Sequence, residues 1–176
     1  ILIKLKLANM EKYKLSEIEA DVDTVYQKIR AVSKNLRPLA FNDERLKIAI
    51  KNLVDDIAAD SHILGSFNFW GEEVINDHKI GLCIYRVIQE ALNNVMKHSK
   101  ASEFSVQVKN THDKISVIVS DNGIGIPNKY FESNENKGTG LFSIKERVEN
   151  LGGTLKINSV LKEGTTLYIE FHKKVS

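Results

Sequence analysis

The most informative stretch of this chain runs from residue 89 to residue 99 and reads Gln-Glu-Ala-Leu-Asn-Asn-Val-Met-Lys-His-Ser. It closes a helix that the sequence predicts from about Asp77 to His98. Apolar residues recur along this helix at steps of three and four, which predicts one face packed into a core. The members of that face are Ile80, Ile84, Val87, Ile88, Ala91, Leu92 and Val95.

Three polar side chains form a second line on the same helix, about 100° from the core face. They are Glu90, Asn94 and Lys97, spaced by four and three. This row suits a polyphosphate that carries a metal ion: an amide oxygen can bind Mg²⁺, an ammonium can meet phosphate charge, and a carboxylate can polarise the reacting group. Taken alone, such a row is weak evidence, because polar residues at these spacings usually form a solvated helix face.

A glycine-bearing segment, Asp121-Asn122-Gly123-Ile124-Gly125-Ile126-Pro127, follows a predicted strand. The glycines Gly123 and Gly125 let the backbone pass close to a flat ligand. Asp121, at the end of the strand, can accept a hydrogen bond from an exocyclic amine. Asp-Asn-Gly is also an ordinary turn sequence, so the segment by itself leaves both interpretations open.

A second glycine-bearing segment, Lys137-Gly138-Thr139-Gly140-Leu141, immediately precedes a predicted helix. Free backbone N–H groups and the positive end of the helix dipole at such a start favour a phosphate. Glycine-rich helix starts also arise by chance. A fourth short segment, Glu163-Gly164-Thr165-Thr166, opens the last predicted strand and is by itself a plain turn.

The remaining pattern predicts an α+β fold. We expect a two-layer sandwich in which helices cover one face of a mixed, mainly antiparallel sheet. One further helix is opened by Asn42 or Asp43 and runs through Leu46, Ile48, Ala49, Leu53 and Ile57. The predicted strands are Ile63 to Trp70, Glu103 to Val108, Lys114 to Val119, Thr154 to Asn158 and Thr165 to Phe171, and the last helix runs from about Thr139 to Leu151, where Gly152-Gly153 stops it.

Residues 1–40 are predicted to form a helical hairpin ahead of a globular domain at residues 41–176. The second hairpin helix has an apolar stripe, Ile18, Val22, Val25, Ile29 and Val32, and ends near Pro38, because a residue before proline avoids the α region. The first segment is ambiguous, since residues 1–7 alternate as a strand does while residues 5–12 favour helix. We interpret it as the tail of a first helix; simple packing is the alternative role for the pair.

Composition and charge limit the kinds of protein that this chain can be. The chain has 176 residues, 42% hydrophobic and 27% charged, so it can bury a real core. A net charge of +2 with mixed signs predicts neither a nucleic-acid groove nor a polybasic membrane patch. No apolar run approaches the ~20 residues that span a bilayer. The single cysteine, Cys83, is predicted to be a buried free thiol.

The four segments, in this order and spacing, resemble the ATPase fold shared by histidine kinases, gyrase-type topoisomerases, clamp-forming heat-shock chaperones and MutL mismatch-repair proteins. Residues 89–99 look like the family's asparagine box, residues 121–125 like its first glycine box, and residues 138–141 like its second. Within that fold the chain is most similar to sensor histidine kinases of the NarL/DesK type. That similarity rests on residues 33–38, 85–94, 144–148 and 151–153.

The resemblance implies a role for each matching residue, with ATP and Mg²⁺ as cofactors. Asp121 would hold the adenine amine, with Gly123, Gly125 and Thr165 beside it. Asn94 would bind the metal, and Lys97 and His98 would face the phosphates. Gly138 and Gly140, next to Leu141, would anchor a lid over residues 128–137. Glu90 would help activate the attacking histidine, with Lys97 as the second catalytic residue.

The resemblance also implies partners. In such kinases phosphate passes from ATP to a histidine on a dimerisation helix and then to a response regulator receiver domain. His112-Asp113 is the one His-Asp pair, and it lies in a turn between strands. We therefore expect the phosphoacceptor to lie upstream of Ile1, so that this chain binds ATP without autophosphorylating. A homodimer through the hairpin and a cytoplasmic location follow, with any membrane anchor in upstream parts of the parent.

Two other classes share these segments. An anti-sigma-factor kinase would phosphorylate a serine or threonine of a partner, although the helix from Ile18 to Pro38 argues against it. A non-catalytic module, in which nucleotide only stabilises a protein-interaction surface, is less favoured because Glu90, Asn94 and Asp121 are all present. The gyrase, chaperone and MutL types need a further transducer domain, for which the chain has no room.

Overall fold

The structure is a computed structural model that describes residues 21–22, 24–25, 46–127 and 140–173. The chain divides into two units, Ile1–Ala40 and Phe41–Ser176. In the first unit the described residues Asp21, Val22, Thr24 and Val25 are helical, in agreement with the predicted second hairpin helix. The rest of the predicted hairpin, and the N-cap at Asn42 or Asp43, lie outside the described residues.

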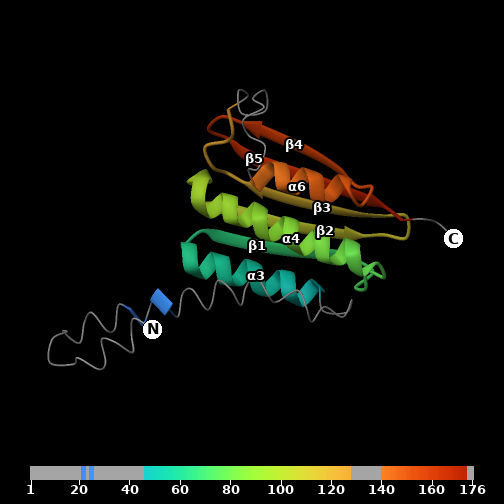
Figure 1. Ribbon diagram of the computed structural model, residues 1–176. Helices are drawn as coiled ribbons and strands as arrows, with labels where there is room; N and C mark the ends of the chain where they lie inside the picture. The colour runs from blue at the N-terminus through green and yellow to red at the C-terminus, as the bar shows by residue number, and fades with distance from the viewer. Residues whose placement is uncertain (1–20, 23, 26–45, 128–139, 174–176) are drawn as a thin grey trace. The chain divides into compact units, whose positions relative to one another are not determined.

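The second unit consists of helices laid over one face of a five-stranded sheet, as Figure 1 shows. This is the predicted α+β arrangement. The helical segments are α3 (Leu46–Ser61), α4 (His78–Asn94) with its π-helical extension η3 (Val95–Ser99), and α6 (Gly140–Glu149). The strands are β1 (Leu64–Gly71), β2 (Glu103–Asn110), β3 (Lys114–Asp121), β4 (Thr154–Val160) and β5 (Gly164–His172).

The sheet is mixed, with strand order β1-β2-β3-β5-β4. β1 pairs with β2 in parallel, and every other pairing is antiparallel. A parallel pair needs a long crossover, and α4 supplies it between β1 and β2. The short connections between β2 and β3 and between β4 and β5 are hairpins. β5 lies between β3 and β4. Because β3 and β5 are antiparallel, the end of β3 lies beside the start of β5.

The core lies between the helices and the sheet. Alternate residues of the central strands are buried there, including Phe104, Val106, Val117, Val119 and Phe171. The predicted core face of α4 is confirmed: its residues from Ile84 to Val95 are at most 5% exposed, and only Ile80 is partly buried. In α3 the predicted inward residues Leu46, Leu53 and Ile57 are buried, whereas Ile48 is 59% exposed and the prediction for it is wrong. Ile50 and Val54 complete the buried stripe.

The ends of the helices agree with the predicted signals. The Asp77 carboxylate accepts hydrogen bonds from the backbone N–H groups of Lys79 and Ile80, which caps α4. After α6, Gly153 N–H donates to Val148 O and Gly152 N–H to Glu149 O. This pair of bonds is a Schellman motif and accounts for the predicted glycine stop.

Cys83 is buried on α4, as predicted. It is 3% exposed and its thiol lies 3.6 Å from the Arg147 carbonyl of α6. Burial raises the pKa of the thiol to about 11, so it stays protonated at neutral pH. This side chain fills the contact between α4 and α6.

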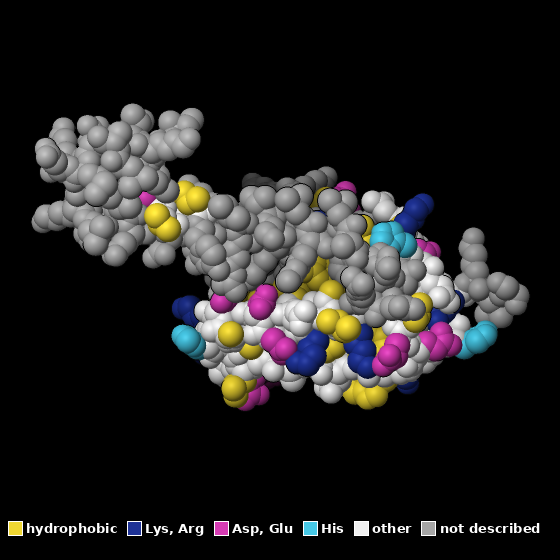
Figure 2. Space-filling model, turned by 90° about the horizontal axis from the view of Figure 1, so that it is seen from below, with side chains coloured by type: hydrophobic (Ala, Val, Ile, Leu, Met, Phe, Trp, Pro, Cys, Tyr) yellow, Lys and Arg dark blue, Asp and Glu magenta, His cyan; other side chains and the backbone are white. Residues whose placement is uncertain are grey.

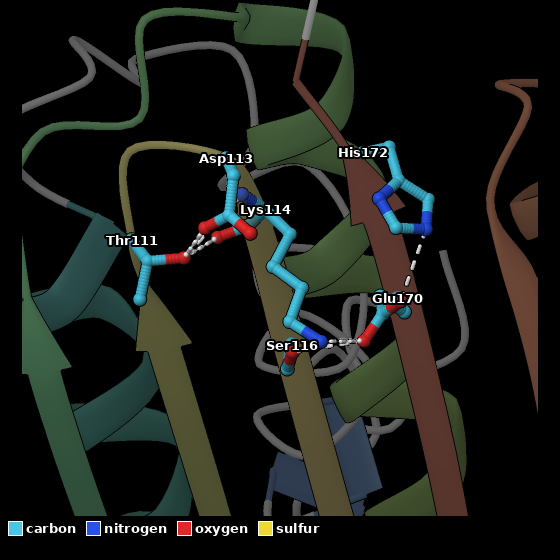
Figure 3. A network of polar contacts seen from close by, with 6 residues as sticks. All are labelled: Thr111, Asp113, Lys114, Ser116, Glu170 and His172. Carbon is cyan, nitrogen blue, oxygen red and sulfur yellow. Dashed lines mark hydrogen bonds and ion pairs between the residues drawn. The ribbon is translucent and has the colours of Figure 1, made fainter.

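A network of polar side chains closes the far end of β3 and β5 (Figure 3). Lys114 Nζ lies 2.7 Å from Glu170 Oε2, and His172 Nε2 lies 3.1 Å from Glu170 Oε1. Beside them the Thr111 hydroxyl donates to Asp113 Oδ1 at 2.6 Å. The face of the described residues seen in Figure 2 carries basic, acidic and apolar side chains interspersed, with no patch of one sign. No helix of the described residues is long and apolar enough to cross a membrane.

Candidate functional site

Four segments that are far apart in the sequence lie together at one end of the second unit. They are the last turns of α4 and η3, the end of β3, the start of α6 and the start of β5. Between them lies a cavity of about 570 Å³. Its described lining residues are Ala91, Asn94, Val95, His98, Ser99, Val119, Asp121, Ile124, Gly125, Ile126, Pro127, Gly140, Leu141, Thr165 and Leu167. The lining is mostly apolar with a few converging polar groups, which is typical of a small-molecule site.

Asp121 is the ionisable group at the sheet side of the cavity. Burial raises the pKa of its carboxyl group, while hydrogen bonds from the backbone of Gly123 and Thr165 act in the opposite direction. Asp121 Oδ1 accepts the Gly123 N–H at 2.8 Å. A half-buried carboxylate whose geometry is held by backbone donors is a strong, directed acceptor for an N–H group of a ligand.

Gly125 allows the loop after β3 to touch the turn between β4 and β5. Its φ is +70°, and a methyl group built on it would lie 2.3 Å from the Val160 carbonyl oxygen. Lys162 N–H donates to Ile124 O at 2.9 Å across the same contact. A side chain at this position would therefore have to push the two loops apart. Ile124 and Ile126, on either side of Gly125, both line the cavity.

Gly140 brings the start of α6 against the polar row of α4. A methyl group built on it would lie 2.2 Å from Glu90 Oε1 and 3.0 Å from Asn94 Nδ2. The second glycine segment and the polar row, predicted separately from the sequence, are therefore in direct contact. This close approach leaves the first turn of α6 facing the same space as Asn94.

The end of α4 departs from regular helix. Residues 95–99 form a π-helical turn, and Lys100, which follows, adopts a left-handed conformation with φ of 53°. A π turn takes more residues per revolution than an α turn. His98, four residues after Asn94, lines the cavity, whereas Lys97 is not among the described lining residues; both side chains are exposed. Such turns occur frequently at functional sites.

The structure brings most of the predicted site residues together. Seven of them line the cavity: Asn94, His98, Asp121, Gly125, Gly140, Leu141 and Thr165. Gly123 is buried behind Asp121, and Glu90 lies against Gly140, which lines the cavity. Lys97 is not among the described lining residues, and its predicted role stays a prediction. Gly138 and the predicted lid, residues 128–137, lie outside the described residues.

Sequence reasoning assigned no role to several lining residues. The apolar side chains of Ile124, Ile126 and Leu167 form much of the wall, and Ser99 ties the helix end to the loop after β3. Ile124 N–H donates to the Ser99 carbonyl at 2.7 Å. The alternation of apolar residues with the glycines in residues 123–127 was the available signal for the two isoleucines. Ser99 had no such signal, because its contact joins distant segments.

The donor groups fit a metal ion that arrives with a polyphosphate. Among the described residues no three His, Cys, Asp or Glu side chains gather as a metal cage. The Asn94 side chain lines the cavity, and its buried Nδ2 atom has no hydrogen-bond partner; as an N–H donor it suits an acceptor such as a phosphate oxygen. A neutral amide oxygen is a normal ligand for Mg²⁺, which keeps waters and takes its other ligands from substrate phosphates. The Asn94 amide would thus meet a phosphate oxygen through Nδ2 and hold a nucleotide-bound magnesium ion through Oδ1.

Helices on one face of this mixed sheet, with the cavity between α4 and the first turn of α6, define a two-layer α+β sandwich with a small-molecule site at one end. Residues 81–175 match the family model described as Histidine kinase-, DNA gyrase B-, and HSP90-like ATPase. The match covers more than half of the 176 residues, and the chain belongs to this family.

Curated relatives agree on the branch of the family. The chain is 32% identical over 135 residues to the signal transduction histidine-protein kinase/phosphatase UhpB of Salmonella typhimurium, covering 76% of this chain and 26% of that protein. It is 30% identical over 157 residues to DegS of Brevibacillus brevis, covering 88% and 39%. It is 30% identical over 155 residues to the oxygen sensor histidine kinase NreB of Staphylococcus carnosus, covering 87% and 44%. The predicted resemblance to sensor histidine kinases is confirmed, and the chain spans less than half of these relatives.

Solved structures confirm the fold. The catalytic domain of the histidine kinase ThkA superposes with a TM-score of 0.59 at 20% identity, covering 76% of this chain and 94% of that chain. The histidine kinase domain of the blue-light activated kinase of Erythrobacter litoralis EL346 gives a TM-score of 0.55 at 19% identity, covering 72% and 60%. At such identities the likeness concerns the fold alone.

Proposed function

We propose that this chain is the ATP-binding catalytic domain of a two-component sensor histidine kinase. Its parent would transfer the γ-phosphate of ATP to a histidine on a dimerisation helix, and from there to an aspartate of a response regulator receiver domain. One observation carries the proposal: Asp121 and Asn94, predicted to hold opposite ends of a nucleotide, line one cavity from two distant elements. The relatives named above support the kinase assignment.

The residues at the sheet side would select and orient the base. Asp121 accepts an N–H of the adenine ring, and its own geometry is held by Gly123 N–H. Ile124, Ile126 and Leu167 cover apolar faces of the cavity, where a flat ring is desolvated. Burial of the ring favours binding, and the carboxylate fixes its direction.

The residues at the helix side would hold the phosphates. Gly140 begins α6, a helix of ten residues whose first N–H groups and dipole favour an anion. Asn94 would ligate Mg²⁺, which supplies charge neutralisation to the phosphates when bound. His98 lines the same part of the cavity. Glu90 would accept the proton of the attacking imidazole, and Lys97 would add positive charge. Positioning and charge neutralisation are the main contributions of a protein to such a transfer.

The first unit, Ile1–Ala40, is proposed to be part of the dimerisation hairpin, which would make the parent a homodimer. Val22 and Val25 are 49% and 41% exposed, so the described turn of this helix has apolar side chains available for a partner helix.

The first test is calorimetric titration of the chain with ATP and ADP, with and without Mg²⁺. The proposal expects both nucleotides to bind, with Mg²⁺ strengthening ATP binding. No binding of either would contradict it.

Phosphotransfer decides the class of kinase. A dimerisation helix with a His-Asp motif would be joined ahead of residue 1 and the protein incubated with γ-labelled ATP. A label that is stable to base and lost in acid identifies phosphohistidine and supports the proposal. Label on a serine of a partner, or ATP binding without any transfer, would replace it by the anti-sigma-factor type or by a non-catalytic module.

A further inference from the structure

Three polar side chains lie in one row across the three strands next to the cavity. Asp121 of β3 pairs with Thr165 of β5, and Thr165 pairs with Ser159 of β4. Residues directly opposite in neighbouring strands project from the same face of a sheet, with their Cβ atoms about 5 Å apart. Asp121 and Thr165 line the cavity, whereas Ser159 is not among the described lining residues and lies behind Thr165.

The Ser159 hydroxyl has three polar partners. The Ile126 N–H donates to Ser159 Oγ at 2.7 Å, and Ser159 Oγ lies 3.1 Å from the Gly164 carbonyl oxygen and 2.9 Å from Thr165 Oγ1. A serine hydroxyl has one proton to donate and two lone pairs that accept. Ile126 N–H can only donate and the Gly164 carbonyl can only accept. All three contacts are hydrogen bonds together only when Ser159 donates its proton to the Gly164 carbonyl and the Thr165 hydroxyl donates its own proton to Ser159.

We propose that Ser159 is a positioning residue that fixes the polarity of the Thr165 hydroxyl, so that Thr165 faces the cavity as a hydrogen-bond acceptor only. Thr165 cannot rotate its proton toward a ligand without giving up its bond to Ser159. The same hydroxyl of Ser159 holds the Ile126 N–H, so the loop after β3 and the start of β5 share one anchor.

The consequence is a specificity for the base, and it rests on the proposed ATP-binding function. Asp121, when ionised, is also an acceptor only. Two acceptors then converge on the sheet side of the cavity, which favours a ring that presents an amino group with two N–H bonds. A purine with an oxygen at position six brings a third acceptor to this place and offers a single donor there, its N1–H, so one buried acceptor is left unpaired, which is a source of discrimination.

The test compares the affinities of ATP and inosine triphosphate, which differ at position six of the base and in the proton that inosine carries on N1, by calorimetry in the presence of Mg²⁺. The wild-type chain is expected to prefer ATP strongly. In Ser159→Ala the Thr165 hydroxyl is free to donate, so the ratio of the two affinities should fall roughly 3- to 10-fold, the range of one neutral hydrogen bond. Ser159→Thr keeps the hydroxyl and should restore the ratio.

Ser105→Ala is the matched control, because Ser105 Oγ lies 2.9 Å from Ser120 Oγ in a similar hydroxyl pair in a row with no described cavity-lining residue. It should leave both affinities unchanged. If Ser159→Ala does not fold, Ser159→Cys keeps the side-chain shape with a weak acceptor and should also lower the ratio. An unchanged ratio, with both affinities lowered equally, would show a merely structural role and overturn the inference. A wild-type chain that binds ATP and inosine triphosphate equally would also overturn it, whereas one that binds neither would overturn the proposed function itself.

Discussion

Asp121 has an unfavourable environment for its charge in the absence of a ligand. Its pKa is raised above the usual value of 3.8 because the carboxyl group is partly removed from water. The folded protein therefore holds this proton to a higher pH than the unfolded chain does. The stabilisation associated with the protonated form is fully present below pH 3.8 and is lost as the pH rises through the folded-state pKa. At neutral pH the ionised group lowers the stability of the free domain, which is the opposite of the usual effect of a paired aspartate.

Asp121→Asn should separate binding from folding. The amide keeps an oxygen for Gly123 N–H but loses the charge, so we expect ATP affinity to fall roughly 10- to 100-fold, as for a hydrogen bond to a charged group. The melting temperature of the ligand-free variant should be equal to or above that of the wild type. Calorimetry and thermal unfolding at neutral pH measure the two effects, and unchanged ATP affinity would remove the adenine assignment.

Gly140 shows how one residue depends on the contact between two helices. A methyl group there would meet the Glu90 carboxylate and the Asn94 amide. We expect Gly140→Ala to lower Mg²⁺-ATP affinity roughly tenfold, because overpacking of this size costs about 1–3 kcal/mol and displaces both side chains. The affinity is measured by titration with ATP in Mg²⁺.

Gly81→Ala is the matched control for that variant. Gly81 lies inside α4, where a methyl group would meet only Leu46, at an ordinary 3.7 Å. Alanine is favoured over glycine in a helix, so this variant should be more stable by about 0.5–1 kcal/mol with unchanged ATP affinity. If both variants lost ATP affinity equally, a general sensitivity of α4 rather than the Gly140 contact would be responsible.

At the scale of the elements, α4 contributes most to both the core and the site. Its first turn is capped by Asp77, its middle is buried, and its end supplies Asn94 and His98 to the cavity. The cap at Asp77 and the site residues Asn94 and His98 lie at opposite ends of this helical segment. Stability and binding can therefore be tested separately on it.

Removal of the cap should destabilise the domain without changing its site. Asp77→Ala leaves two backbone N–H groups of α4, those of Lys79 and Ile80, without their carboxylate acceptor. We expect a loss of about 1 kcal/mol in the free energy of unfolding, measured by urea denaturation. Asp77→Ser, which keeps an acceptor, should recover most of it. If Asp77→Ala also lowered the ATP affinity of the folded protein, the cap and the ATP site would not be independent, and this prediction would be wrong.

For the whole molecule, ligand binding should appear as stabilisation. A nucleotide that binds only the folded state at about 100 times its dissociation constant adds about 2.7 kcal/mol to the free energy of unfolding. We expect ATP with Mg²⁺ to raise the melting temperature of the wild type, and inosine triphosphate at the same concentration to raise it less. The absence of any shift at saturating ATP would contradict the proposed site.

The polar network at the far end of β3 and β5 should have a small and pH-dependent effect. The hydrogen bond from Lys114 lowers the pKa of Glu170 below 4.5, and the hydrogen bond from Thr111 lowers that of Asp113 below 3.8. The stability from these carboxylates is present above those values and is lost as the pH falls through their folded-state pKa values. The Glu170 hydrogen bond raises the pKa of Lys114 above 10.5, so the stability from the ammonium is present below that value and is lost as the pH rises.

Glu170→Gln should therefore cause a small decrease in melting temperature between about pH 5 and pH 10. Exposed ion pairs contribute little and are screened, so the decrease should vanish at about 1 M salt. Thermal unfolding across pH and salt measures this. A large decrease that persists in high salt would mean that Glu170 has a packing role beyond its charge.

Much of this protein followed from the sequence alone. Periodicity predicted the helices and strands of residues 46–127 and 140–173, with ends that differ by a few residues, because the pattern of burial is written directly into the spacing of apolar side chains. The order of the boxes predicted the family, and cavity residues such as Asn94, Asp121, Gly140 and Thr165 were identified before any geometry was known. These residues could be found because the short segments that contain them rarely occur together in this order in one chain.

Only the tertiary structure decided how these parts meet. The sequence assigned both Lys97 and His98 to the phosphates, and only the structure showed that His98 is among the described cavity-lining residues and Lys97 is not. The contact of Gly140 with Glu90 depends on α6 packing against α4. The row of Asp121, Thr165 and Ser159 depends on β5 inserting between β3 and β4. Strand order and register are set by packing of the whole sheet, since a local sequence carries its own periodicity but not the identity of its neighbour.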